Sequence, residues 1–173
     1  MKYCAFLRGV NVNGTSMKMV EVCVVFSKAG MSNVASVLAS GNIIFESDQD
    51  SSVLKEILEK SMSLHFNYEA FLFLKSKDEV SAIFNQNPFP KNDTLHVYSF
   101  VGIDGVEDIL LEEFANSKKV EFEDAKIVNG YFYWQVPKGN TLDSTFGKVL
   151  GKKLLKDKMT SRNINTFEKI LKK

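Results

Sequence analysis

The chain has 173 residues, of which 45% are hydrophobic and 25% are charged, and its formal net charge is +1. This composition is that of an ordinary globular protein with enough apolar residues for a real core, and it excludes collagen-like and low-complexity chains. No apolar run approaches the ~20 residues of a membrane-spanning helix, and the first residues lack the layout of a signal peptide. We therefore expect a cytoplasmic protein with no membrane partner.

The charges are unevenly distributed along the chain. Residues 138–173 carry 10 Lys or Arg against 3 Asp or Glu, whereas the preceding part is acidic. A basic end can attract phosphate-bearing partners. However, Lys148, Lys152 and Lys156 are spaced by four, which is typical of the solvated face of one helix, and we favour that interpretation.

Cysteine and histidine usage argues against metal chemistry. Cys4 and Cys23 lie inside apolar runs, which is typical of reduced, buried thiols. His65 and His96 are the only histidines, and neither has a cysteine or carboxylate at ligand spacing. We therefore predict no metal site and no cofactor.

The first half of the chain predicts the order strand, helix, strand, strand, helix, strand. The expected ranges are 2–8, 17–29, 34–38, 43–46, a helix from 51, and 69–75. Gly30 follows the first helix where a left-handed residue is wanted, and Ser40-Gly41-Asn42 has the composition of a tight turn.

A helix and a boundary follow. Ser76 and Glu79 have the spacing of a capping box, which predicts a helix after the last strand. The next stretch is polar and holds two prolines, N-Q-N-P-F-P-K-N-D over 85–93, which indicates an internal boundary. We expect a first unit over 1–76, a helix and proline-containing linker over 77–94, and a second unit over 95–173.

The second half repeats the order of the first. Strands are expected over 95–101, 120–128, 131–136 and 157–161, and helices over 106–114, 142–155 and 164–171. The two middle strands are joined by Asn129-Gly130, a strong hairpin signal. The spacing from Gly9 to Gly41 is 32 residues and that from Gly102 to Gly130 is 28. The fold class predicted is α+β, a tandem duplication of ferredoxin-like βαββαβ units with antiparallel sheets, plus a C-terminal helix.

The segment L-R-G-V-N-V-N-G-T-S over 7–16 resembles a phosphate-binding loop in its glycine spacing. Thr15 stands where such a loop needs lysine, and the predicted sheet is antiparallel, so we exclude nucleotide hydrolysis by a P-loop. Two interpretations stay open. Arg8, Asn11, Asn13 and backbone N–H groups would bind an anion, or the glycines and asparagines would only serve the turn.

The predicted strand order places a second segment, Ser40-Gly41-Asn42, beside the segment over 7–16. In a βαββαβ unit the end of the first strand and the hairpin between the next two share one edge of the sheet. We therefore expect Ser40, Gly41 and Asn42 beside Arg8 and Asn11.

The third segment, T-S-R-N-I-N-T-F-E over 160–168, starts the closing helix. Asn165 and Glu168 have the spacing of a helix cap, and Asn163 or Ser161 could also start that helix. Arg162 stands just before the helix, where the dipole disfavours a cation, and an arginine beside free N–H groups is a sensible anion clamp.

Aromatic residues alternate along the strand over 131–136. Tyr131 and its neighbours, with Tyr98 and Phe100 on the adjacent strand, occupy the positions at which ferredoxin-like RNA-binding domains stack bases. Because one face must pack on the helices and the other can pack within the protein, we favour core packing.

The three segments L-R-G-V-N-V-N-G, S-G-N-I-I-F and T-S-R-N-I-N-T resemble the signature segments of a bacterial family, domain of unknown function 1697. The resemblance covers essentially the whole chain. It implies two α+β units related to the ferredoxin-like plait and supplies no reaction. The residues it marks are Arg8, Gly9, Asn11, Gly14, Ser40, Gly41, Asn42, Thr160, Arg162, Asn163, Asn165 and Thr166.

The chain also departs from the family pattern. Asn13 stands where a glycine is usual, Ala39 replaces a glutamine and Ile164 replaces a tryptophan. Thr15 and Thr145 each stand where a lysine is common, so two cations of the family are missing.

These features predict a binding protein for an anionic small molecule or nucleotide. The expected ligand-binding residues are Arg8, Asn11, Ser40, Gly41, Asn42, Arg162, Asn163, Asn165 and Thr166. The arginines would hold charge and the asparagine amides would orient the ligand. One alternative is an enzyme that uses Ser40 or a carboxylate of the same pocket. The other is a single-stranded RNA-binding module that uses Tyr98, Tyr131 and the basic end.

Overall fold

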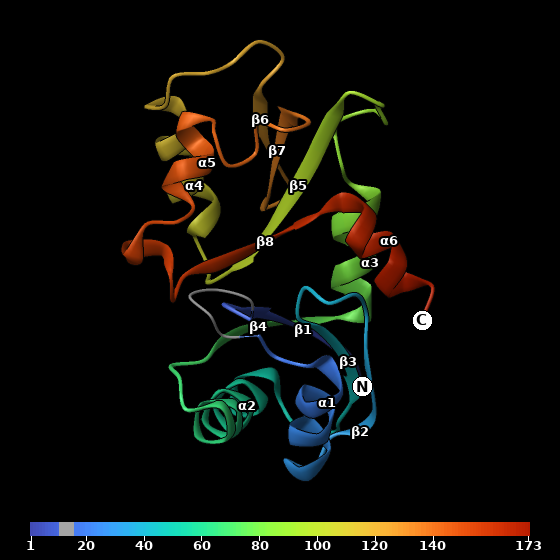
Figure 1. The fold of residues 1–173 in the computed structure, drawn as a ribbon. Helices are drawn as coiled ribbons and strands as arrows, with labels where there is room; N and C mark the ends of the chain where they lie inside the picture. Colours follow the sequence, from blue (N-terminus) through green and yellow to red (C-terminus); the bar gives the residue numbers. More distant parts are fainter. Residues whose placement is uncertain (11–15) are drawn as a thin grey trace. The chain divides into compact units, whose positions relative to one another are not determined.

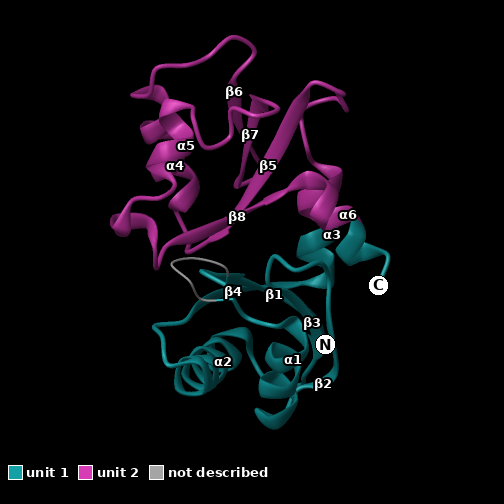
Figure 2. Cartoon of the chain, in the orientation of Figure 1, with its two compact units in different colours: residues 1–81, 169–173 teal, residues 82–168 magenta. Residues whose placement is uncertain are grey.

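The computed structural model describes residues 1–10 and 16–173. The chain divides into two compact units (Figures 1 and 2). Unit 1 contains residues 1–81 and 169–173, and unit 2 contains residues 82–168. The division falls inside helix α3 (Lys77–Asn85), so the assignment of 77–94 as a linker stays a prediction.

Unit 1 is a four-stranded antiparallel sheet with two helices on one face (Figure 1). Its strands are paired in the order β2-β3-β1-β4. The elements are β1 (Lys2–Arg8), α1 (Met19–Lys28), β2 (Ser32–Ser36), β3 (Asn42–Glu46), α2 (Ser51–Phe66) and β4 (Phe71–Ser76).

Alternate residues of β1 build the core of unit 1. Ala5 and Leu7 are buried on the helical side of the sheet, because side chains alternate between the two faces of a strand. Helix α2 covers them with Leu54, Leu58 and Met62, which recur at helical spacing and are fully buried. This pattern is the one that predicts the helix from the sequence.

Unit 2 repeats the arrangement of unit 1. Its strands are paired in the order β6-β7-β5-β8, again antiparallel. The elements after α3 are β5 (Leu95–Gly102), α4 (Val106–Ala115), β6 (Asp124–Val128), β7 (Tyr131–Pro137), α5 (Thr145–Val149), a 3₁₀ turn (Lys153–Leu155), β8 (Met159–Asn163) and α6 (Ile164–Leu171). The predicted α+β duplication of two βαββαβ units with a C-terminal helix is confirmed.

Aromatic rings form the core of unit 2. Trp134 and Phe146 have ring centroids 5.1 Å apart, and Phe146 also meets Phe114 edge-on at 5.3 Å. The Trp134 indole N–H donates to Glu123 Oε1 at 2.9 Å, so the one polar atom of this ring is satisfied inside the core. The interpretation of the β7 aromatics as core residues is confirmed, since Phe132 is also buried.

The prediction of one helix over 142–155 is wrong, because the structure has a short helix α5 and a separate 3₁₀ turn there. Ser144 caps a short α5 by accepting the backbone N–H of Gly147 at 2.9 Å. A Cβ at Gly147 would lie 1.8 Å from the Thr141 carbonyl oxygen. The first turn of α5 therefore packs directly on the backbone of the loop that precedes it. Gly151 follows soon after, and two glycines in so short a stretch disfavour a longer helix.

The strand expected over 120–128 is shorter than predicted. Only residues from Asp124 onward pair with β7. Phe122 has a φ of +65°, a left-handed conformation that interrupts an extended strand, and Glu123 N–H donates to the Val120 carbonyl in a turn. No pattern in the sequence indicates that Phe122 adopts a left-handed backbone conformation.

Candidate functional site

The first two sequence motifs meet at one edge of the unit 1 sheet. The Leu7 N–H donates to the Gly41 carbonyl at 2.8 Å. Gly41 has a φ of +78°, and a Cβ there would lie 2.9 Å from Val10 Cγ1. The predicted adjacency of the strand end and the hairpin is confirmed, and Gly41 is needed both for its backbone conformation and for the close approach.

Asn42 holds this hairpin together. Its side chain is fully buried, and its Nδ2 donates to the Val37 carbonyl at 2.9 Å and to Ser40 Oγ at 3.0 Å. Ser40 itself is exposed, and Arg8 is partly buried at the end of β1. Asn11 lies outside the described residues. The amide nitrogen of Asn42 therefore serves the turn, which is a structural role for a residue predicted to bind a ligand.

The third motif lies in unit 2, on β8 and the start of α6. Arg162 is opposite Ser99 of β5 and only 7% exposed. Its Nη1 donates to Thr160 Oγ1 and to the Ser161 carbonyl, both at 2.8 Å. These contacts fix the end of β8, and Arg162 thereby positions Asn163, the next residue along the chain.

Asn163 directly precedes α6 and is one of the three helix starts that the sequence leaves open. Its Oδ1 accepts the Asn165 N–H at 3.0 Å, which satisfies one of the backbone donors at the start of a helix. Thr166 is buried and Asn165 is exposed. The motif residues thus lie in two separately described units, and a site that combines all three motifs stays a prediction.

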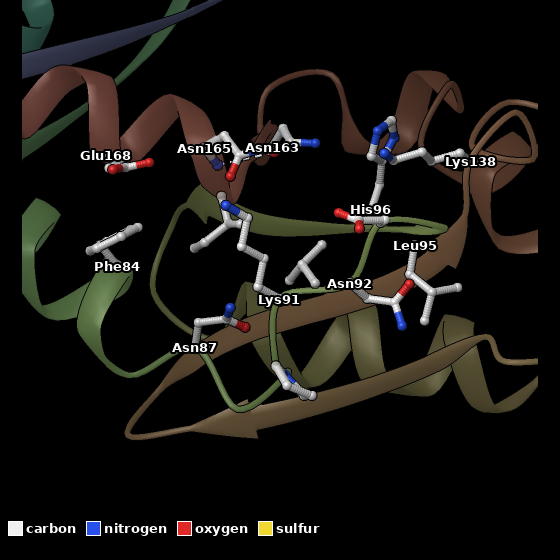
Figure 3. A pocket seen from close by; sticks show the side chains of 14 residues that line it. Phe84, Asn87, Lys91, Asn92, Leu95, His96, Lys138, Asn163, Asn165 and Glu168 are labelled. Carbon is white, nitrogen blue, oxygen red and sulfur yellow. Dashed lines mark hydrogen bonds between the residues drawn. The ribbon is translucent and has the colours of Figure 1, made fainter.

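Two predicted residues, Asn163 and Asn165, line a cavity of about 410 Å³ in unit 2 (Figure 3). The other walls come from the end of α3, from the segment that joins α3 to β5, from the start of β5 and from the residue after β7. That last residue is Lys138. It is brought to the cavity because Leu95 pairs with Pro137 and because the Lys138 N–H donates to the Thr94 carbonyl at 2.9 Å.

Three asparagines of the cavity have their orientation fixed by backbone donors. In each, a backbone N–H two residues further along the chain donates to the side-chain Oδ1. The pairs are Asn87 with Phe89 (3.1 Å), Asn92 with Thr94 (2.8 Å) and Asn163 with Asn165 (3.0 Å). Because a backbone N–H can only donate, these oxygens are used inside the protein, and amide N–H groups are what Asn92 and Asn163 have left for a ligand.

The charged groups of the cavity are of both signs. Lys91 and Lys138 supply two ammonium groups, and Asp93 and Glu168 supply two carboxylates. Burial, and secondly the Lys138 ammonium, hold the pKa of His96 below its ordinary value. The imidazole is therefore neutral at neutral pH and can take up a proton when an anion binds beside it.

Lys91, Lys138 and His96 are not among the site residues that the sequence predicts, and Asn87 and Asn92 are predicted only as residues of an internal boundary. A signal for the asparagines exists, because N-x-F and N-x-T within a proline-containing segment are typical of turns closed by an asparagine side chain. Nothing in the sequence connects Lys138 with Lys91, since only the pairing of β5 with β7 brings them to one cavity.

Two tyrosines of the aromatic strands make contacts within unit 2. The Tyr98 ring packs on Trp134 with centroids 5.6 Å apart, and its hydroxyl lies 3.2 Å from Thr141 Oγ1. Tyr133 is buried and donates to the Ile83 carbonyl at 2.7 Å. Since a base stacks on an exposed ring, the RNA-binding alternative stays a prediction without support from these side chains.

Two further observations concern the part of the chain that the structure describes. There, no three His, Cys, Asp or Glu side chains cluster in a way that could hold a metal ion. None of the helices in residues 1–10 and 16–173 is both long enough and apolar enough to cross a membrane.

Comparisons with known proteins give a fold and a family. A solved structure of a conserved bacterial protein from Streptococcus pneumoniae is similar with a TM-score of 0.77 and 23% sequence identity, over 99% of this chain and 98% of that one. At this identity the likeness shows the fold alone. Among curated proteins no sequence matches. A family model described as protein of unknown function (DUF1697) matches residues 1–133, and the chain belongs to this family.

Proposed function

We propose that the protein binds a small anionic ligand that carries phosphate, in the cavity of unit 2. The observation that carries this proposal is the set of hydrogen-bond donors in the lining, which lie in the same cavity as the carboxylates of Asp93 and Glu168. Asn92 and Asn163 have their side-chain oxygens occupied by backbone N–H groups, and Lys91 and Lys138 can only donate. A ligand with several acceptor oxygens, such as a phosphate ester, complements such a lining.

The position of the charges supports an anion at one end of the cavity. In Figure 3 Lys138 and His96 lie together at one end, whereas Glu168 lies at the other. Repulsion from Glu168 is therefore weakest beside Lys138, where His96 can add a second positive charge by taking up a proton. This charge is needed because the Asp93 carboxylate also lines the cavity. The volume of about 410 Å³ falls in the range of about 300–1,000 Å³ that is typical of small-molecule pockets.

The start of α6 also favours the binding of an anion. Asn163 and Asn165 lie at its first turn, where the helix dipole places partial positive charge. Asn163 and Asn165 are thus the members of the predicted ligand-binding set that we propose contact this ligand. Arg162 acts through them, because its bonds to Thr160 and Ser161 hold the strand that ends at Asn163.

Calorimetric titration of the full chain tests the proposal. Inorganic phosphate, ribose 5-phosphate and AMP are the probes. Lys138→Ala and Lys91→Ala should each weaken the binding of phosphate compounds about tenfold, which corresponds to the loss of about 1.4 kcal/mol of a charge-assisted contact. Lys148→Ala is the matched control, because Lys148 is an exposed lysine on α5 that does not line the cavity.

The proposal fails if none of the three compounds binds. It also fails if Lys148→Ala weakens binding as much as Lys138→Ala, since the effect would then come from net charge and not from the cavity.

A further inference from the structure

One carboxylate of the unit 2 cavity is carried close to its cationic end by the sheet. Asp93 and Lys138 both line the cavity. The carbonyl of Thr94, the residue after Asp93, accepts the backbone N–H of Lys138 at 2.9 Å, and Leu95 pairs with Pro137. The chain segments that carry Asp93 and Lys138 are therefore held side by side at the end of the β5–β7 ladder. An anion bound beside Lys138 has a negative charge of the protein nearby.

The charged side chains of this region are not paired with one another. Among residues 1–10 and 16–173, Asp93, Lys91 and Lys138 form no ion pair, and all three residues are exposed. Glu168 differs from them in two ways. It already interacts with another group of the protein, and it lies at the opposite end of the cavity from Lys138 (Figure 3). Asp93 is therefore the carboxylate of the lining that is left to pair with a ligand.

A ligand with two unlike charges complements this arrangement. A phosphate monoester carries a charge of about −1.5 to −2 at neutral pH, and its oxygens suit the Lys138 ammonium. An alkyl ammonium is charged at neutral pH and can only donate hydrogen bonds, so it suits the Asp93 carboxylate, which can only accept them. A molecule with both groups keeps a net negative charge, and it avoids the repulsion from Asp93 that a purely anionic ligand would meet.

We infer that the ligand is a phosphate monoester that also carries a primary ammonium group. The phosphate lies against Lys138 and against His96, which is at the same end of the cavity (Figure 3). The ammonium group lies against Asp93. This inference rests on the proposed function and adds the second charged group of the ligand. A cavity of about 410 Å³ has room for both groups within one small molecule.

Calorimetric titration of the full chain with matched pairs of compounds tests the inference. O-phosphoethanolamine is compared with 2-hydroxyethyl phosphate, and 3-aminopropyl phosphate is compared with 3-hydroxypropyl phosphate. Within each pair an ammonium group replaces a hydroxyl group, and the second pair places that group one carbon further from the phosphate. In at least one pair the amine should bind about threefold more tightly, which is the effect expected of an ion pair that is open to solvent.

Asp93→Asn should remove this preference. The hydroxyl compound is freed from a repulsion, so it should bind about twofold more tightly than to the unaltered chain. The amine also loses its ion pair, so its binding should not become tighter. Because Asp93 is exposed and forms no ion pair, the variant should fold normally. Asp104→Asn is the matched control, since Asp104 is an exposed aspartate of unit 2 that does not line the cavity.

The outcomes are distinct. Equal binding of the amine and the hydroxyl compound in both pairs overturns the inference and leaves the proposed function standing. A preference that Asp93→Asn does not change also overturns it, because the ammonium group would then lie elsewhere. The same holds if Asp104→Asn removes the preference as fully as Asp93→Asn, since the cause would then be net charge. If none of the four phosphate compounds binds, both the inference and the proposed function fall.

Discussion

Tyr68 and Tyr133 have buried hydroxyl groups with different surroundings. The Tyr133 hydroxyl donates to the Ile83 carbonyl at 2.7 Å. The Tyr68 hydroxyl is the one buried side-chain polar atom without a hydrogen-bond partner in the described part of the chain. Burial, and then the Glu59 carboxylate, raise the pKa of Tyr68 to about 12. Burial also raises the pKa of Tyr133, with Tyr131 as the second cause.

We predict opposite effects for the same substitution at these two positions. Tyr68→Phe should raise the free energy of unfolding by about 1 kcal/mol, because it removes a buried polar atom whose desolvation is not compensated. Tyr133→Phe should lower it by about 1 kcal/mol, because the Ile83 carbonyl loses its donor. Urea denaturation at neutral pH measures both. An equal loss of stability in the two variants would contradict the assignment of Tyr68 as unsatisfied.

At the scale of one element, helix α3 begins with the capping box that the sequence predicts. The Ser76 N–H donates to Glu79 Oε2 at 2.7 Å, and the Glu79 N–H donates to Ser76 Oγ at 3.2 Å. Lys75 Nζ lies 2.9 Å from Glu79 Oε1. Burial alone would raise the pKa of Glu79, but the Ser76 hydrogen bonds and Lys75 together hold the pKa below its ordinary value.

The capping box should make the free energy of unfolding depend on pH. Because the pKa of Glu79 is lower in the folded chain than in the unfolded chain, its contribution is present above pH ~4.5 and is lost as the pH falls through the folded pKa. Glu79→Gln should therefore lower the free energy of unfolding by about 1 kcal/mol at pH 7 and have little effect near pH 3. Thermal denaturation across this range measures it. Asp78→Asn, an exposed carboxylate in the same turn, is the control and should show a smaller loss at pH 7.

Local signals explain which elements the sequence predicts well. β1 and α6 have the expected bounds, and the capping box and the Asn129-Gly130 turn depend on neighbouring residues alone. The helix over 142–155 is wrong because its limits depend on the contact between Gly147 and the Thr141 carbonyl. Periodic apolar residues indicate a buried face, but they do not show how long the helix that carries it will be.

The site shows the same division between local and distant causes. Asn163 and Asn165 could be predicted because a helix start has a recognisable spacing. Lys91, Lys138 and His96 come from three separate segments, and only strand pairing brings Lys138 beside the start of β5. Asn42 matched a family motif but is fully buried in its own turn, so its sequence signal reflects the fold.

At the scale of the whole molecule, each unit has its own core and its own share of the motifs. Unit 1 buries its apolar side chains between one sheet and α1 and α2, and unit 2 buries aromatic rings between its sheet and α4 and α5. The cavity of the proposed function lies within unit 2 alone. The predicted three-motif site also includes Arg8 and Ser40 of unit 1. A ligand bound in the unit 2 cavity and a ligand bound at the three-motif site would slow hydrogen exchange in different backbone segments.

Hydrogen exchange with and without AMP distinguishes the two arrangements. We predict slower exchange in peptides that cover residues 84–97 and 163–168, because the ligand stabilises the segments that line the cavity. Exchange in peptides that cover β1 and β3 should stay unchanged, and the same AMP concentration should protect nothing in Lys138→Ala. Slower exchange around residues 7–10 and 40–42 would contradict a site confined to unit 2. It would instead show that the first two motifs also respond to the ligand, as the sequence predicts.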